Sequence, residues 1–196
     1  MTFSVIISMV LFALVASITP GPVNLLSLSC SARFGAKSGL IFVTGATLGF
    51  IVLFLFIGFS LHLLVDKLVW FTAIIQWFGI AFLAYLSYQL FTDNGEFNQD
   101  NVINAPNFIT GVLMQWLNPK AWLASLSGIA AYIPDASSIE VVTFASVYLP
   151  ICWFSLACWV WLGMRLGQHF QSAAKVRLMN KALALLLLGS CVLLVI

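Results

Sequence analysis

The sequence predicts an all-α, polytopic membrane protein with six transmembrane helices. Hydrophobic residues make up 62% of the 196 residues and charged residues only 7%, and the mean hydropathy is +1.09. A globular domain in water carries about 25% charged residues, so this chain has too few ionic groups to cover a water-facing surface. Its uncharged stretches are also long enough to cross a bilayer, which takes about 20 residues per helix.

This composition excludes a soluble enzyme, a disordered linker and a nucleic-acid-binding protein. The eight Lys and Arg residues are spread along the chain and leave a net charge of only +2, so they form no patch that follows a phosphate backbone. The expected surroundings are membrane lipid, and no nucleic-acid partner is expected.

Charged residues separate six apolar stretches, each long enough to span the bilayer at a rise of about 1.5 Å per residue. Four are uncharged throughout: residues 1–32, 38–65, 68–92 and 141–164. The other two run from about 107 to 133, with Lys120 inside, and from about 177 to 196, with Lys181 near one end. These boundaries predict six helices.

The positively charged flanks predict that both chain termini lie outside, because Lys and Arg beside a span are retained in the cytoplasm. Most of these residues fall in the first and fifth connections: Arg33, Lys37, Arg165, Lys175, Arg177 and Lys181. The opposite side of the membrane receives only Lys67.

The polar segment 93–106 divides this single membrane domain, residues 1–196, into halves of three spans each, residues 1–92 and 107–196. It is rich in Asp, Glu and Asn, and we expect an acidic cytoplasmic connection there. Because each half has three spans, the second half enters the membrane from the opposite face. The halves are therefore predicted to be inverted three-helix repeats, a common design among secondary transporters.

The first span contains a break, Thr19-Pro20-Gly21-Pro22-Val23-Asn24. Each proline removes a backbone donor and clashes with the preceding turn, and the glycine tolerates torsion angles that other residues avoid. An open backbone at membrane depth is tolerated only where it is buried in protein or lines a wet cavity. The break is therefore expected to face the interior of the bundle.

The fourth span carries a comparable break, Gln115-Trp116-Leu117-Asn118-Pro119-Lys120. Asn118 is a favoured N-cap, and Pro119 suits the first helical position. Each break exposes a half-helix N-terminus, and in inverted halves the two N-termini would converge near the midplane with unpaired N–H groups that suit a carboxylate. The alternative is that the prolines only kink the helices, which is our interpretation of Pro150.

Lys120 is the ionisable residue placed well inside a span, where a lysine costs about 2.5 to 3.5 kcal/mol. Such a charge indicates a functional site, although a lysine can also reach water with its long stem or lose its proton. No Asp or Glu is available at that depth, so the site favours a carboxylate and disfavours substrates with a second cationic group. A small, neutral amino acid fits this chemistry.

The residues predicted to bind the substrate are Thr19, Pro20, Gly21, Pro22, Asn24, Gln115, Asn118, Pro119 and Lys120. The substrate ammonium would be met by opened carbonyls or by Asn24, Gln115, Thr44, Thr47, Trp116 or Trp122. We predict no metal and no cofactor, because the four cysteines lack C-x-x-C spacing and neither histidine has a second histidine or a carboxylate at ligand spacing. No catalytic residues are predicted.

Two small-xxx-small pairs, Gly45 with Gly49 and Gly163 with Gly167, predict close helix packing. They would also suit a dimer face, so the chain is a possible homo-oligomer. Two rival functions remain. An intramembrane enzyme would use Ser125, although no histidine lies at a comparable depth to activate it, and an oligomeric channel would lack an evident ring of charges.

The two breaks, together with residues 45–49 in the second span and 79–90 in the third, resemble the lysine exporter (LysE) superfamily over nearly the whole chain. Within it, the chain is most similar to the homoserine/threonine exporter (RhtB) branch. The resemblance implies a multi-pass carrier of the bacterial inner membrane that exports amino acids or their derivatives, driven by the proton motive force.

Phe50 departs from the pattern of this superfamily, in which many members carry an acidic residue directly after the second-span glycine. A proton-coupling role for that acid cannot be transferred to this chain, which leaves Lys120 or the substrate as the proton carrier. The same departure resembles the cysteine and O-acetylserine exporters of the branch, which agrees with a neutral substrate.

Overall fold

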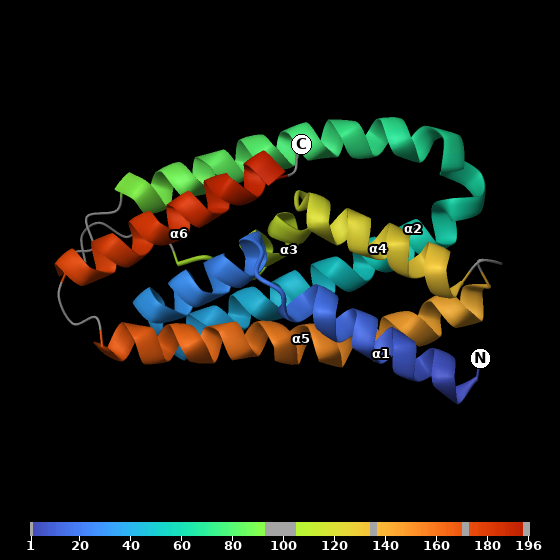
Figure 1. Ribbon diagram of the computed structural model, residues 1–196, viewed down its shortest axis with the longest axis horizontal. Helices are drawn as coiled ribbons and strands as arrows, with labels where there is room; N and C mark the ends of the chain where they lie inside the picture. Colours follow the sequence, from blue (N-terminus) through green and yellow to red (C-terminus); the bar gives the residue numbers. More distant parts are fainter. Residues whose placement is uncertain (1, 93–104, 134–136, 170–172, 194–196) are drawn as a thin grey trace.

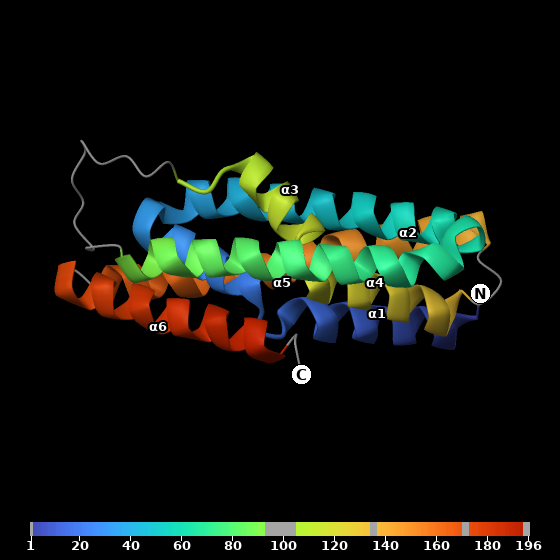
Figure 2. The ribbon, with the colours of Figure 1, turned by 90° about the horizontal axis from the view of Figure 1, so that it is seen from above.

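The computed structural model describes residues 2–92, 105–133, 137–169 and 173–193. Over these residues the protein is all-α, as predicted. Its helices are α1 (Phe3–Ile18), α2 (Pro22–Thr92), α3 (Phe108–Trp116), α4 (Pro119–Tyr132), α5 (Ser138–His169) and α6 (Ala173–Leu193). Figure 1 and Figure 2 show an elongated bundle in which the helices run roughly along its long axis.

These helices do not correspond one to one with the six predicted spans. The predicted first span is divided between α1 and the start of α2, and the predicted fourth span is divided between α3 and α4. Helix α2 continues through the second and third stretches and reverses direction twice in Figure 1. Gly35 permits the first reversal, because its φ of 81° lies in the left-handed region that other residues avoid.

Two helical stretches of the described residues are long and apolar enough to cross a bilayer, Pro22–Ser60 and Ser138–Gly167. Helix α1 is a shorter apolar helix. The six-span topology, the inverted repeats and the outer position of the termini stay predictions. The acidic connection falls almost entirely on residues 93–104, which lie outside the described residues.

The glycine pairs hold helices of one bundle together. A Cβ at Gly45 would overlap the backbone of Phe108, so the second stretch of α2 lies directly against α3. A Cβ at Gly163 would overlap the carbonyl of Leu28, so α5 approaches the first stretch of α2 equally closely. The prediction of close packing is confirmed within the chain.

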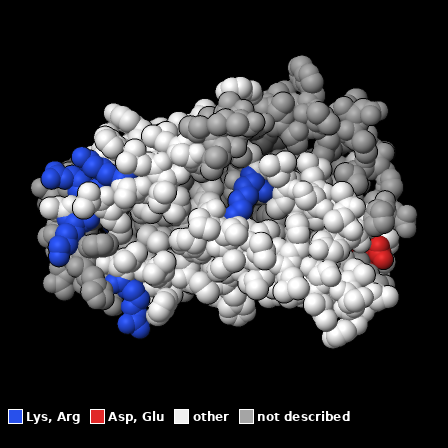
Figure 3. Space-filling model, in the orientation of Figure 1, with Lys and Arg blue, Asp and Glu red and all other residues white. Residues whose placement is uncertain are grey.

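Basic side chains gather at one end of the molecule, and the described acidic side chain lies at the other (Figure 3). The basic end contains the turn of α2 at Gly35, the last turns of α5 and the start of α6 (Figure 1). Charges from the first and fifth connections therefore lie together in space. One cation lies apart from them, near the middle of the face in Figure 3.

Candidate functional site

The two predicted breaks lie next to each other. Helix α1 ends at Ile18 and α2 begins at Pro22, while α3 ends at Trp116 and α4 begins at Pro119. The ammonium of Lys120, in the first turn of α4, donates to the carbonyl of Thr19 at 2.8 Å, to its hydroxyl at 2.9 Å and to the carbonyl of Pro20 at 3.5 Å. One side chain thus joins breaks that are a hundred residues apart in the sequence.

The carbonyls at the end of α1 are satisfied by side chains from three other helices. Asn24 Nδ2 reaches Ser17 O at 2.9 Å from α2, Trp159 Nε1 reaches Ile18 O at 3.1 Å from α5, and Lys120 Nζ reaches Thr19 O from α4. Pro22 has no amide proton to donate to Ile18, so a partner from outside the helix is needed there. These bonds satisfy the backbone groups that the break frees inside the bundle.

The break between α3 and α4 is closed by its own residues. Asn118 Oδ1 accepts from the Lys120 amide at 3.1 Å, and Asn118 O accepts from the Ala121 amide at 2.9 Å. Trp122 Nε1 donates to Trp116 O at 2.8 Å across the corner. The predicted roles of Asn118 as N-cap and of Pro119 as the first helical residue are confirmed.

The two half-helix N-termini therefore differ, and one part of the sequence-based expectation is wrong. Unpaired amides were expected at both, but Asn118 occupies those at the start of α4. At the start of α2 the amides of Val23 and Asn24 donate to no described residue, because the preceding Gly21 has no side chain to cap them. Of the two half-helix N-termini at the breaks, the one at α2 is therefore available to bind an anion.

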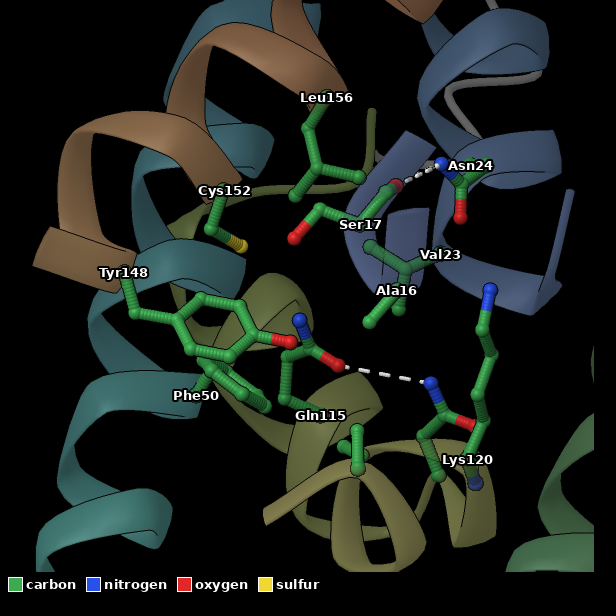
Figure 4. A pocket seen from close by; sticks show the side chains of 13 residues that line it. Ala16, Ser17, Val23, Asn24, Phe50, Gln115, Lys120, Tyr148, Cys152 and Leu156 are labelled. Atoms are coloured by element: carbon green, nitrogen blue, oxygen red, sulfur yellow. Dashed lines mark hydrogen bonds between the residues drawn. The ribbon is translucent and has the colours of Figure 1, made fainter. Parts of the chain in front are cut away.

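A small inner cavity of about 40 Å³ lies between the breaks (Figure 4). Its polar lining consists of Ser17, Asn24, Gln115, Asn118, Lys120, Tyr148 and Cys152, and its apolar lining includes Val23, Phe50 and Leu156. This space holds about three water molecules. None of the described residues that line it is Asp, Glu or His.

A larger and more open cavity of about 390 Å³ adjoins the inner one and shares Ala16, Asn118, Lys120 and Ala124 with it. Its other lining residues are Phe12, Pro20, Gly21, Pro22, Leu123 and Ser127. Sites for small molecules typically occupy about 300 to 1,000 Å³. The outer cavity is thus large enough for an amino acid, whereas the inner cavity must widen to accept one.

The structure brings almost all of the predicted site residues together. Asn24, Gln115, Asn118 and Lys120 line the inner cavity, Pro20, Gly21 and Pro22 line the outer one, and Thr19 binds Lys120. Pro119 is buried at the start of α4 and lines neither of these cavities. Gly21 leaves room for the lysine, since a Cβ there would lie 3.2 Å from Lys120 Cδ.

Among the lining residues that were not predicted as site residues are Ser17, Phe50, Tyr148 and Cys152. Tyr148 and Cys152 are one helical turn apart on α5, a spacing that the apolar fifth stretch does not distinguish from ordinary packing. Phe50 had a signal, its departure from the superfamily pattern, but only the structure places it in the cavity wall.

Several residues considered for the substrate ammonium, or for catalysis, make structural contacts instead. The Thr44 hydroxyl donates to Leu40 O, and the Trp122 indole donates to Trp116 O. Ser125, the candidate of the enzyme hypothesis, is fully buried and donates to Ala121 O within α4. Among the described residues, no histidine lines either cavity to activate a serine.

Comparison with known proteins agrees with this arrangement. The family model described as LysE type translocator matches residues 14–196. A cysteine/O-acetylserine efflux protein of Escherichia coli O1:K1 is 28% identical over 182 residues, and one of Salmonella typhimurium strain LT2 is 26% identical, each over 90% of both chains. No solved structure matches the chain. The protein therefore belongs to the LysE type translocator family.

Proposed function

We propose that this protein exports small neutral amino acids or their derivatives from the cytoplasm across the bacterial inner membrane. Threonine, homoserine, cysteine, O-acetylserine and leucine are the candidates, and the proton motive force is the expected driving force. The observation that carries the proposal is the junction of the two breaks at Lys120, beside cavities that no described acidic residue lines.

The substrate carboxylate is assigned to the start of α2. The amides of Val23 and Asn24 have no acceptor among the described residues, and the positive end of the α2 dipole lies there. The Lys120 ammonium lies beside Gly21, and its present partners are neutral oxygens that leave its charge uncompensated. Amides and ammonium together favour one negative group.

A substrate with a neutral side chain fits the remaining polar groups. The inner cavity offers hydroxyls, amides and a thiol, but its described lining contains no carboxylate to pair with a second cation. An unpaired charge in such a site is costly, so lysine and arginine are disfavoured. The similar relatives are named for the efflux of cysteine and O-acetylserine, whose side chains are uncharged.

Transport requires the passage between the two cavities to widen. The outer cavity has room for an amino acid, and the inner cavity holds only about three waters, so passage between them needs α1 and α4 to move apart. Alternating access by rocking of two inverted halves, each with three spans, supplies such a movement. Because Phe50 has no acidic group, Lys120 or the substrate is the proposed proton carrier.

The test is uptake into everted membrane vesicles, in which export from the cell becomes accumulation. Norleucine and lysine form a suitable pair, since they differ mainly in the terminal ammonium, and threonine and cysteine complete the panel. We expect a protonophore to abolish accumulation of the neutral substrates, and lysine not to accumulate above vesicles that lack the protein. Preferential accumulation of lysine, or of none of the panel by inserted protein, would contradict the proposal.

A further inference from the structure

The inner cavity has two chemically different ends. At the end beside the breaks lie the side-chain amides of Asn24 and Asn118 and the ammonium of Lys120. At the other end lie Ser17 from α1 together with Tyr148 and Cys152 from α5. Figure 4 shows the Ser17 hydroxyl, the Cys152 thiol and the Tyr148 hydroxyl directed into the same space.

Tyr148 is held rigidly. Its side chain is 1% exposed, and its ring lies against those of Phe50 and Phe144 at centroid distances of 4.6 Å and 5.7 Å. These contacts fix the ring and leave the hydroxyl as its one polar atom, which reaches the cavity (Figure 4). A fixed hydroxyl in a buried wall discriminates between ligands better than a mobile one.

Ser17 and Cys152 are positioned just as firmly. The carbonyl of Ser17 accepts the bond from Asn24, which anchors the end of α1 against the start of α2. Cys152 is 3% exposed, and its thiol interacts with the Ser17 hydroxyl and with the buried Thr47 hydroxyl. A hydroxyl can donate one hydrogen bond and accept two, so the contacts of Ser17 with Tyr148 and Cys152 leave acceptor positions in this wall for a ligand.

We infer that Ser17, Tyr148 and Cys152 form the subsite for the substrate side chain, and that they select short uncharged side chains ending in a hydroxyl, thiol or ester group over apolar side chains of the same shape. This inference rests on the proposed function, which directs the carboxylate to the opposite end. Hydroxyls donate and accept, so they match each of these groups. An apolar isostere forms no hydrogen bond with these groups, which reduces its binding relative to the polar substrate.

The experiment compares uptake of two isosteric pairs into everted vesicles, threonine with valine and cysteine with α-aminobutyrate. In the unmodified protein we expect the polar member of each pair to be preferred. Tyr148→Phe removes one oxygen atom and should reduce that preference by about tenfold. The matched control is Tyr132→Phe, because the Tyr132 hydroxyl donates to Ser8 O outside both cavities. This variant should keep the preference of the unmodified protein for the polar member of each pair.

A second pair of variants keeps the inference testable if Tyr148→Phe fails to fold. Ser17→Ala removes the facing hydroxyl, and Ser125→Ala is its control, since Ser125 is buried but bonded within α4. The inference would be overturned if the variants reduced the uptake of both members of each pair equally. It would also be overturned if Ser17→Ala and Tyr148→Phe both kept the preference of the unmodified protein. Failure of the proposed function is distinguishable, because the unmodified protein would then transport neither member of either pair.

Discussion

At the break between α1 and α2, the freed carbonyls depend on Asn24, Trp159 and Lys120 from three different helices. At the break between α3 and α4, by contrast, the cap and the corner are closed by Asn118, Trp116 and Trp122 from the same short segment. Both breaks contain an asparagine, but Asn24 donates to the helix before it, whereas Asn118 accepts from the helix after it.

This difference indicates which break depends on the positions of the other helices. The first break keeps its hydrogen bonds only while α1, α2, α4 and α5 stay in place, so any movement of these helices must exchange bonds there. The second break carries its own partners and can move as one piece with α4. A helix movement that changes access to the cavities would therefore exchange hydrogen bonds at the first break.

The largest effect is expected from Lys120→Gln, which removes the charge and the link between the two breaks. A hydrogen bond to a charged group is worth about 1.5 to 3 kcal/mol, so the initial rate of uptake into everted vesicles should fall at least about tenfold. Lys175→Gln, on an exposed residue near the start of α6, is the control. Equal rates in the two variants would show that Lys120 does not serve transport.

The next largest effect is expected from Asn24→Ser. Serine is too short to reach Ser17 O, so a buried carbonyl loses its partner and the free energy of unfolding should fall by about 1 to 3 kcal/mol. The unfolding of the purified protein in detergent, followed with increasing denaturant, measures this change. An unaltered stability would mean that the carbonyl finds another partner and that the first break is not held by Asn24.

Gly21→Ala should have an intermediate effect on transport. The added Cβ would lie 3.2 Å from Lys120 Cδ and 3.3 Å from Lys120 Nζ, so the lysine must shift by a few tenths of an ångström from its oxygen partners. We expect the rate of uptake to fall about threefold, which corresponds to part of one charged hydrogen bond. Gly189→Ala, where nothing lies within 4 Å of the added atom, should behave like the unmodified protein.

The smallest effect is expected from Asn118→Ser, the same substitution at the second break. Serine is as good an N-cap as asparagine, so the Lys120 amide keeps an acceptor and the stability should change by less than about 0.5 kcal/mol. Measured in the same denaturant series as Asn24→Ser, this variant tests the comparison directly. Equal losses in the two variants would show that both breaks are stabilised in the same way.

Local sequence rules predicted both breaks, because proline, glycine and asparagine act on the backbone of their own segment. The close packing at Gly45 and Gly163 was also predictable, because glycine has no side chain to keep two helices apart. The partners at the first break could not be predicted. Trp159 and Ile18 are distant in the sequence, and nothing in an apolar helix indicates which tryptophan turns towards which carbonyl.

The sequence by itself determined that this chain is apolar and all-helical, that two helices open at Pro20 and Asn118, and that a lysine lies beside one opening. Composition and backbone chemistry are enough for these features. Only the tertiary structure decided that Lys120 bonds to Thr19, that the start of α2 keeps unpaired amides while the start of α4 does not, and that Ser17, Phe50 and Tyr148 line the inner cavity. Each of these depends on which helix faces fill the same space, and that is fixed by the packing of the whole bundle.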